Sequence, residues 1–460
     1  MSSRFTIADG TERLSSHSGL ALIGALMDDT QLKDRLSQVT LPSCVEPEIS
    51  HGDVACSMIG LLCLGKPDFA AIEPFRQDPF FVQSLGLDAC PSSVTLRQRL
   101  DMVGSTFDPI VKEESAELLR QRAPNLLPVS TSAGTFVPVD LDVSPFDNSN
   151  TQKEGVSKTY KGDDGYAPMF AYIGHEGYQL HVELREGKQH CQAGTPEFLR
   201  ESLGYAKRMT TQRLLVRLDA GNDSQDNIKV CRKAKVDWII KRNLRKEAPE
   251  AWLTFAKQVG TSFSPRNGKT VWRGETFREM PKLETRLRIV FQVTERAISA
   301  SGQLLLVPEV DVETYWTSLP CPPKEVIALY HDHGTSEQFH SEIKSDMDLE
   351  RLPSGNFATN AVILRVGMLA YNRLRICGQA SLQDAEGGAE PRPAYRRKAE
   401  RRRLRTVMQD LMYLACRVIT HARIWTLSFG RYCPWKAVWK RLYQTFTSPP
   451  KKGPSMALSP

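Results

Sequence analysis

The sequence predicts a mixed α/β protein, in which an α/β core with a β-rich insertion lies between a helical N-terminal domain and a basic helical C-terminal region. Three observations lead to this prediction. Apolar residues recur at helical spacing through 12–123, alternating strand patterns begin near residue 135, and basic residues concentrate after residue 390. We place the N-terminal domain, the first part of the core, the insertion, the second part of the core and the C-terminal region at 1–130, 131–244, 245–324, 325–390 and 391–460.

The N-terminal domain contains a candidate DNA-reading helix. Ser93 is a plausible N-cap, and the first turns after it would project Gln98 and Arg99. A short polar helix after a turn is compatible with a helix-turn-helix motif, although an ordinary surface helix gives the same pattern more often. Arg97 and Arg99 are the candidate DNA contacts of this domain.

The core is predicted from the order of its strands and helices. The first strand is expected at 136–143, and Asp140, Asp142 and Ser144 share one of its faces. A helix is expected to start with Thr195 as its N-cap and Pro196 at its first helical position. Further strands are expected at 169–173, 178–184, 213–219 and 236–240. Three antiparallel strands followed by helix, strand, helix and strand is the plan of the RNase H-like fold.

The insertion interrupts this plan. Short strands are expected at 271–273, 287–293 and 303–307. Helix is expected to return from residue 324, to continue through 330–348, and to form again at 360–374. A stretch at 383–393, which contains two adjacent glycines and two prolines, is expected to be a linker.

Three carboxylates fall at positions that this plan brings together: Asp142 on the first strand, Asp219 at the end of the fourth, and Glu337 on the helix after the insertion. Two-metal phosphoryl transfer needs three or four carboxylates around two Mg²⁺ ions. The first and fourth strands are neighbours in the plan, so Asp142 and Asp219 would repel each other unless a cation lay between them. The order of these three residues therefore favours a catalytic site.

A second pattern surrounds Glu337. Tyr330, Glu337 and Lys344 are seven residues apart, so on a regular helix they share one face. An ordinary polar helix face would give the same spacing. Together with the two aspartates, the pattern resembles bacterial insertion-sequence transposases of the DDE type, specifically the hairpin-forming branch with a β-rich insertion. The signature of that branch, Y-x2-R-x3-E-x6-K, matches here except that His333 occupies the arginine position.

Two further motifs carry the resemblance, which spans about residues 130–375. Asp142 is followed two residues later by Ser144, as in the first motif of the family, and Arg217, Asp219 and Gly221 are similar to its R-x-D-x-G pattern.

The resemblance implies a metal-dependent DNA transposase. Asp142, Asp219 and Glu337 would be catalytic and would bind two Mg²⁺ ions, with Mn²⁺ as an alternative. Lys344 would contact a DNA phosphate, and Tyr330 would position the end of the transposon strand. Two copies, as a homodimer on DNA, would cut the inverted-repeat ends and join them to target DNA.

Several alternatives stay open. Asp140 shares the strand face of Asp142 and rivals it as the first metal ligand. His333 is only partly cationic at neutral pH and lacks the bidentate grip of arginine on phosphate, so a decayed or repurposed transposase that only binds DNA is the main alternative. A nuclease of RNase H-like fold without strand transfer is a third reading, against which the signature and the insertion argue.

Other residues are candidates for DNA contact. In hairpin-forming members a tryptophan holds a flipped base, and Trp316, with Trp272 behind it, is the candidate here, although a core tryptophan is the more common reading. Arg185, Lys188 and His190 would face DNA or lie in a solvated loop.

The net charge of +7 hides an uneven distribution. Residues 391–460 carry 16 Lys/Arg and two acids, which gives +14, whereas the other 390 residues carry 44 basic and 51 acidic residues, which gives −7. Arg401 and Arg402 belong to a basic cluster at the start of an apolar stripe with helical spacing, formed by Leu404, Val407, Leu411, Leu414 and Val418. We interpret this region as a packed helix with a DNA-binding arm.

The remaining features indicate a cytoplasmic protein, and the resemblance implies that it is bacterial and associated with the nucleoid. The ten cysteines are scattered singly without C-x-x-C spacing, which argues against a zinc ribbon and favours free thiols in a reducing compartment. The N-terminal residues include no apolar signal region, and the longest apolar run, 54–64, is shorter than the roughly 20 residues that span a bilayer.

Overall fold

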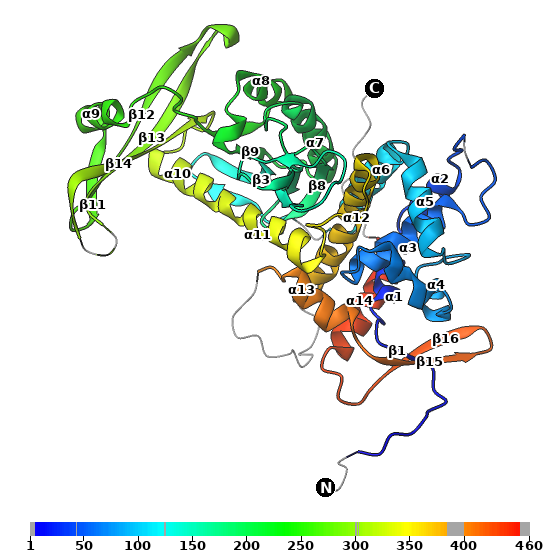
Figure 1. Cartoon of the computed structure of the whole chain (residues 1–460). Helices are drawn as coiled ribbons and strands as arrows, with labels where there is room; N and C mark the ends of the chain where they lie inside the picture. Colours follow the sequence, from blue (N-terminus) through cyan, green and yellow to red (C-terminus); the bar gives the residue numbers. More distant parts are fainter. Residues whose placement is uncertain are drawn as a thin grey trace. The chain divides into compact units, whose positions relative to one another are not determined.

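The structure is a computed structural model that describes residues 5–42, 44–123, 126–299, 301, 303–383 and 400–450. The chain forms two compact units: unit 1 is Met1–Pro124 with Glu342–Pro460, and unit 2 is Asn125–Ser341. Unit 1 is mostly helical, whereas unit 2 is a large sheet with covering helices (Figure 1). The chain is therefore a mixed α/β protein, as the sequence predicts.

Unit 1 is organised around α12 (Phe357–Leu382), which is buried on nearly all sides because α3, α5 and α6 pack against it. Most of its buried side chains are apolar, and Arg373 and Arg375 are buried among them. No helix among the described residues is long and apolar enough to cross a membrane. Unit 1 also contains α1 (Leu20–Met27), α2 (Leu32–Ser37), α3 (His51–Cys63), α4 (Pro79–Ser84), α5 (Ser93–Val103), α6 (Asp108–Arg122), α13 (Leu404–Val407) and α14 (Lys436–Thr447).

Two predicted helix starts shift by one residue. Ser92, not Ser93, caps α5, because the Ser92 hydroxyl accepts a hydrogen bond from the backbone N–H of Thr95 at 3.1 Å. In unit 2, α7 (Thr195–Met209) has Gly194 as its N-cap with a φ of 76°, so Thr195 is already helical. The Thr195 hydroxyl instead donates to the carbonyl of Cys191.

The predicted helix through residue 418 is wrong beyond residue 412. After α13, a π-helical turn (Met408–Met412) leads into a hairpin of β15 (Cys416–His421) and β16 (Ile424–Phe429), and β15 also pairs with β1 (Leu14–Ser15). Ala422 and Arg423 form the two-residue turn with φ values of 49° and 65°. The β-branched run from 418 to 420 favours strand over helix, which explains the change. The predicted linker and the basic residues 396–398 lie at least partly outside the described residues, since 384–399 are not described.

Unit 2 contains a ten-stranded sheet in the order β11-β12-β13-β14-β10-β9-β3-β7-β8, with β2 paired to β3. β7 is antiparallel to both of its neighbours, β3 and β8, and β9 and β10 continue the sheet parallel to β3. This is the strand order that the sequence predicts. The bounds are β2 (Val129–Thr131), β3 (Gly134–Val143), β7 (Met169–Ile173), β8 (Tyr178–Glu183), β9 (Leu214–Leu218) and β10 (Asp237–Lys241), and α8 is Gln225–Ala234. A small sheet of β4 (Phe146–Asp147), β5 (Ser157–Lys158) and β6 (Asp164–Tyr166) follows β3.

The insertion extends the same sheet, because β14 pairs antiparallel with β10. Its strands are longer than predicted: β11 (Thr261–Arg266), β12 (Lys269–Met280), β13 (Thr285–Ile298) and β14 (Leu304–Thr317). It also contains α9 (Pro249–Val259), which the sequence pattern did not predict, and whose Trp252 and Ala256 are buried on one face. Figure 1 shows α9 beside the long strands.

The predicted helix from 324 to 348 is present but is not one regular α-helix. α10 (Pro323–His331) leads through a 3-10 turn (Asp332–Thr335) into α11 (Ser336–Ser341), and a π-helical turn (Glu342–Asp346) follows. The 3-10 and π-helical turns interrupt the regular helix that the seven-residue spacing of Tyr330, Glu337 and Lys344 assumes.

Candidate active site

The register of the parallel strands brings two of the predicted carboxylates side by side. Leu141 on β3 is paired with Leu218 on β9, so the next residues along the two strands, Asp142 and Asp219, stand opposite each other at the strand ends. Neighbouring strands are about 4.8 Å apart. Side chains two residues apart on one strand point to the same face of the sheet, so Asp140 shares the face of Asp142, and Arg217 shares the face of Asp219. The sheet therefore places the two aspartates on adjacent strands, facing the same way.

The residues two positions back form a buried ion pair. Arg217 donates from Nε and Nη2 to the two carboxylate oxygens of Asp140, each at 2.6 Å, and from Nη1 to the carbonyl of Leu329 at 2.7 Å. Burial alone would raise the pKa of Asp140, but the positive charges of Arg217 and His333 hold it well below its usual range. Asp140 is thus already neutralised by the protein, which favours Asp142 as the carboxylate available to a metal.

Helix α11 covers this end of the sheet. Phe339 packs against Tyr172 with ring centroids 5.0 Å apart, and it lies so close to Gly177 that a Cβ there would be 2.4 Å from its ring. Gly177 also has a φ of 70°, so both its backbone conformation and the close Phe339 ring favour glycine at this position. The same helix places Nδ1 of His340 at 3.9 Å from Oδ2 of Asp142 and carries the exposed side chain of Glu337.

The electrostatics of Asp142 show that the carboxylates influence one another. Burial raises the pKa of Asp142, and the negative charge of Asp219, with a smaller effect of Glu337, raises it further, to about 7. One oxygen of each aspartate is already hydrogen-bonded, Oδ1 of Asp142 to the N–H of Val143 at 2.8 Å and Oδ1 of Asp219 to Nδ2 of Asn222 at 2.6 Å. The repulsion between these carboxylates is of the kind that a divalent cation relieves.

A preformed metal cluster is not present in the described part of the chain, where no group of three His, Cys, Asp or Glu side chains is gathered tightly enough to hold an ion. The donor chemistry nevertheless fits Mg²⁺, which prefers hard carboxylate oxygens and retains several waters. Two aspartates on adjacent strands and a glutamate on the covering helix are therefore able to hold the ion if their side chains converge on it.

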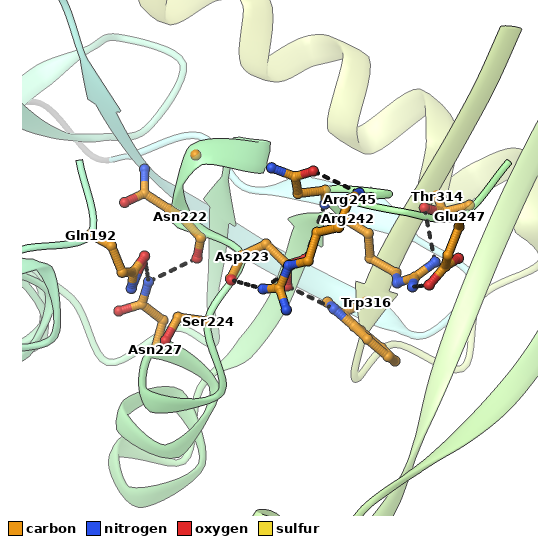
Figure 2. A network of polar contacts seen from close by, with 12 residues as sticks. Gln192, Asn222, Asp223, Ser224, Asn227, Arg242, Arg245, Glu247, Thr314 and Trp316 are labelled. Atoms are coloured by element: carbon orange, nitrogen blue, oxygen red, sulfur yellow. Dashed lines mark hydrogen bonds and ion pairs between the residues drawn. The ribbon is translucent and has the colours of Figure 1, made fainter. Parts of the chain in front are cut away.

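A polar network joins Asp223, just after Asp219 in the chain, to Trp316 of the insertion; Figure 2 shows Asp223 and Trp316. Asp219 precedes a 3-10 turn (Ala220–Asn222), and Asp223 caps that turn. Oδ1 of Asp223 accepts a hydrogen bond from Nε1 of Trp316 at 2.9 Å, and its Oδ2 accepts one from the backbone N–H of Asn243 at 3.0 Å. Trp316 belongs to β14, so the insertion fixes the loop that carries Asp219.

The network continues beyond Trp316. The guanidinium of Arg242 lies 4.8 Å from the centroid of the Trp316 ring and donates to Glu247 at 2.7 Å and to the hydroxyl of Thr314 at 3.2 Å. Arg245 donates to the carbonyl of Asp223 at 3.3 Å. Figure 2 shows Arg242 between Glu247 and Thr314 on one side and the Trp316 ring on the other.

Several predicted DNA contacts are buried instead of exposed. Trp316 is 4% exposed, so its ring offers no open stacking surface. Tyr330 packs against Tyr315 with centroids 4.7 Å apart, and Nδ1 of His333 lies 3.0 Å from Oδ1 of Asp140. His333 therefore faces the buried acid of the sheet, where the carboxylate attracts its imidazole.

Three other residues that were predicted to contact DNA are buried arginines. The guanidinium of Arg99 donates to the carbonyl of Ile49 at 3.1 Å and contacts His51, and that of Arg185 donates to the carbonyl of Cys191 at 3.0 Å. Arg402 is 3% exposed and forms an ion pair with Asp410. These three side chains stabilise the fold where they lie and are not presented to a partner.

The other predicted contacts, except the buried Trp272, are accessible or partly so. Arg97, Lys188 and His190 are exposed. Arg401 and Lys344 are less accessible and lie in unit 1, where Nη1 of Arg401 is 2.6 Å from Oε1 of Glu342, and Nζ of Lys344 is 3.8 Å from Oε1 of Glu350. The second tryptophan candidate, Trp272, is 8% exposed with the ammonium of Lys257 at 5.2 Å from its centroid.

Sequence reasoning missed Arg217, His340 and Asp223 as parts of the site. A signal existed for Arg217, because an arginine two residues before Asp219 on a strand must share its face. No comparable signal existed for Asp223, whose partner Trp316 is 93 residues away.

Comparisons with known proteins identify a family for the chain. The family model described as Transposase DDE domain group 1 matches residues 3–449, which include Asp142, Asp219 and Glu337. Among solved structures, the chain is similar to a piggyBac transposase in a cryo-EM structure of its synaptic complex with hairpin DNA, at 10% identity and a TM-score of 0.40, covering 96% of this chain and 87% of that chain. No curated protein matches the chain significantly.

Proposed function

Because the chain belongs to the family of DDE transposases described as Transposase DDE domain group 1, we propose that it is the transposase of a bacterial insertion sequence, which cuts the ends of its element and joins them to target DNA. The observation that best supports catalysis is the register of β3 and β9, which sets Asp142 beside Asp219. We also propose that β8, β7, β3, β9 and β10, with α7 and α8, form an RNase H-like core.

The proposed catalytic residues are Asp142, Asp219 and Glu337, and we propose that they hold two Mg²⁺ ions, with Mn²⁺ as an alternative. When bound, such ions activate the attacking oxygen and stabilise the leaving oxygen of a phosphodiester. The protein contributes orientation: Asn222 and the N–H of Val143 each fix one carboxylate oxygen, and Arg217 keeps Asp140 out of the site. Fixed geometry of this kind is how phosphoryl transfer is accelerated by positioning.

Incubation of the protein with labelled element-end DNA and Mg²⁺ tests this proposal. Wild type is expected to nick the end, and Asp219→Asn to lose more than roughly 100-fold of the rate, because one of the carboxylates at the proposed metal site becomes a neutral amide. Asp226→Asn is the matched control, since Asp226 is exposed on α8 and forms a surface ion pair with Lys229 at 3.1 Å. Equal loss in both variants, or no Mg²⁺-dependent nicking by wild type, would contradict the catalytic proposal.

A second candidate function is DNA binding without catalysis, as in a decayed or repurposed transposase. One observation favours it: His333 stands where the family has arginine, and its imidazole faces the buried Asp140. Binding of element-end DNA by wild type without nicking in either Mg²⁺ or Mn²⁺ would support this candidate.

We further propose that two copies act together, because the two ends of an element must be cut and joined in one event. Sedimentation of the protein with and without end DNA tests this proposal. A complex with one copy on two ends would contradict it.

A further inference from the structure

An open cavity of about 720 Å³ lies within unit 1, away from the residues that form the candidate active site. Four elements line it: the small-residue face of α1, the helix α4, one face of β16, and α14. On α1, Ala21 and Ala25 carry only a methyl group, and Gly24 lies against the backbone of Ser84, whose carbonyl oxygen would be 1.7 Å from a Cβ at this position. The volume lies within the 300–1,000 Å³ range of sites that bind small organic groups.

One wall of the cavity is aromatic. Trp425, Leu427 and Phe429 alternate along β16 and so present one strand face to the cavity. Trp439 and Tyr443 on α14 are stacked with centroids 5.4 Å apart and an interplanar angle of 9°. The phenol of Tyr443 is 40% exposed, so a flat group entering the cavity has a ring to stack against.

Positively charged side chains of α14 also line the cavity. Lys436, Lys440 and Tyr443 follow one another at helical spacing and all line the cavity. Within the described residues neither lysine has a carboxylate within ion-pair distance, and Asp28 is the acid that lines the cavity. The pKa of Asp28 is raised by burial and by the negative charge of the neighbouring Asp29. Two lysines and one aspartate therefore give the cavity a net positive charge beside its aromatic wall.

We propose that this cavity binds an unpaired nucleotide of the DNA, whose base stacks beside Tyr443 and Trp425 while Lys436 and Lys440 contact the flanking phosphates. Aromatic stacking with cationic phosphate contacts is the general chemistry of unpaired nucleic acid recognition. A purely apolar peptide would leave the two lysines without partners, which is why a polyanion is the favoured occupant. The inference rests on the proposed function insofar as that function supplies DNA as the partner.

The test compares two labelled duplexes of the same sequence, one fully paired and one with a single unpaired thymidine. Wild type is expected to bind the second duplex roughly tenfold more tightly, because stacking of one base on an aromatic side chain has that effect. Tyr443→Leu is expected to abolish the preference. Tyr432→Leu is the matched control, because Tyr432 is 88% exposed in the same C-terminal segment and does not line the cavity.

The lysines give a second measurement that does not depend on an aromatic substitution. The double variant Lys436→Gln and Lys440→Gln is expected to bind both duplexes more weakly and to lower the slope of log affinity against log salt by roughly one to two. Lys66→Gln, an exposed lysine of unit 1 outside the cavity, is expected to leave the slope nearly unchanged. Melting temperatures of all variants separate loss of binding from loss of folding.

Three results would overturn the inference. They are equal wild-type affinity for the two duplexes, equal effects of Tyr443→Leu and Tyr432→Leu, and dissociation of a wild-type dimer by Tyr443→Leu without change in DNA preference, which would make the cavity a contact between copies. Nicking of a paired end by wild type without a preference for the unpaired base would remove this inference alone. The preference without any nicking would remove the catalytic proposal alone.

Discussion

At the scale of single residues, the charge of the buried Asp140 carboxylate is balanced by a buried arginine of the neighbouring strand. Arg217 and Asp140 are 1% and 3% exposed and are joined by two hydrogen bonds. Arg217→Met would leave a buried carboxylate without its main partner, so we expect the free energy of unfolding to fall by about 3–5 kcal/mol. Urea unfolding at neutral pH measures this loss.

The matched control for that prediction is Arg213→Met on the residue that precedes the same strand. Arg213 is 56% exposed and pairs with Asp237 at 2.9 Å, so its loss should cost about 1 kcal/mol or less. Equal destabilisation by the two substitutions would mean that the buried pair contributes no more than a surface pair.

Trp316 is predicted to act through a hydrogen bond and not through base stacking. Trp316→Phe keeps an aromatic ring but removes the N–H that binds Asp223, and so loosens the turn next to Asp219. We expect the rate of end nicking to fall roughly tenfold with DNA affinity unchanged, since misplacement of a catalytic group lowers rate more than binding. Trp272→Phe, also in the insertion, should change the rate less than twofold, and a wild-type rate for Trp316→Phe would argue against the anchor.

At the scale of elements, buried strands were predicted well and the C-terminal helix was not. β3 and β9 carry continuous or alternating apolar residues that no helix would bury in the same way, and their order correctly placed Asp142 and Asp219 on neighbouring strands. The segment 404–418 has apolar spacing that fits a helix, yet its last part forms β15, because pairing with β1 and β16 decides the conformation there. The hydrogen bonds between Arg217 and Asp140 depend on register across 77 residues, which local patterns do not encode.

The junction between α9 and the strands of the insertion should become less stable at acid pH. Burial would raise the pKa of Glu247, but hydrogen bonds from Arg278, Arg242 and Trp252 lower it to about 2. Folding therefore favours the ionised form, and this stabilisation is complete above about pH 5 and is lost as the pH falls towards 2. We expect wild type to lose roughly 1–3 kcal/mol more than Glu247→Gln over that range in chemical unfolding.

The control for the pH experiment is Glu250→Gln, on the exposed face of the same helix. It should follow the wild-type curve. If the free energy of unfolding of Glu247→Gln changed with pH in parallel with that of wild type, the Glu247 carboxylate would not contribute to the pH dependence of stability.

At the scale of the whole molecule, the basic C-terminal segment is part of the fold of unit 1. Leu404, Val407 and Leu411 are buried, as are Leu442 and Phe446 on α14. Part of the positive charge is neutralised within the unit, because Glu342 pairs with Arg401 and Asp346 pairs with Arg403. The expected DNA-binding arm is thus a packed substructure in which only some cations are free to meet phosphate, and deletion of residues 400–450 would expose the core of the unit.

This division of the charge predicts two different outcomes for two variants of equal charge. Replacing the exposed Arg417, Arg423 and Arg431 by Gln should reduce the salt slope of DNA binding by up to about 0.9 for each phosphate that these arginines neutralise, with little change in melting temperature. Replacing Arg401, Arg402 and Arg403 by Gln should lower the melting temperature, because the buried Glu342 and Asp346 would each lose one arginine partner and Asp410 would lose Arg402, and should change the slope less. If both triple variants changed the slope equally, charge number and not its placement in the fold would determine DNA affinity.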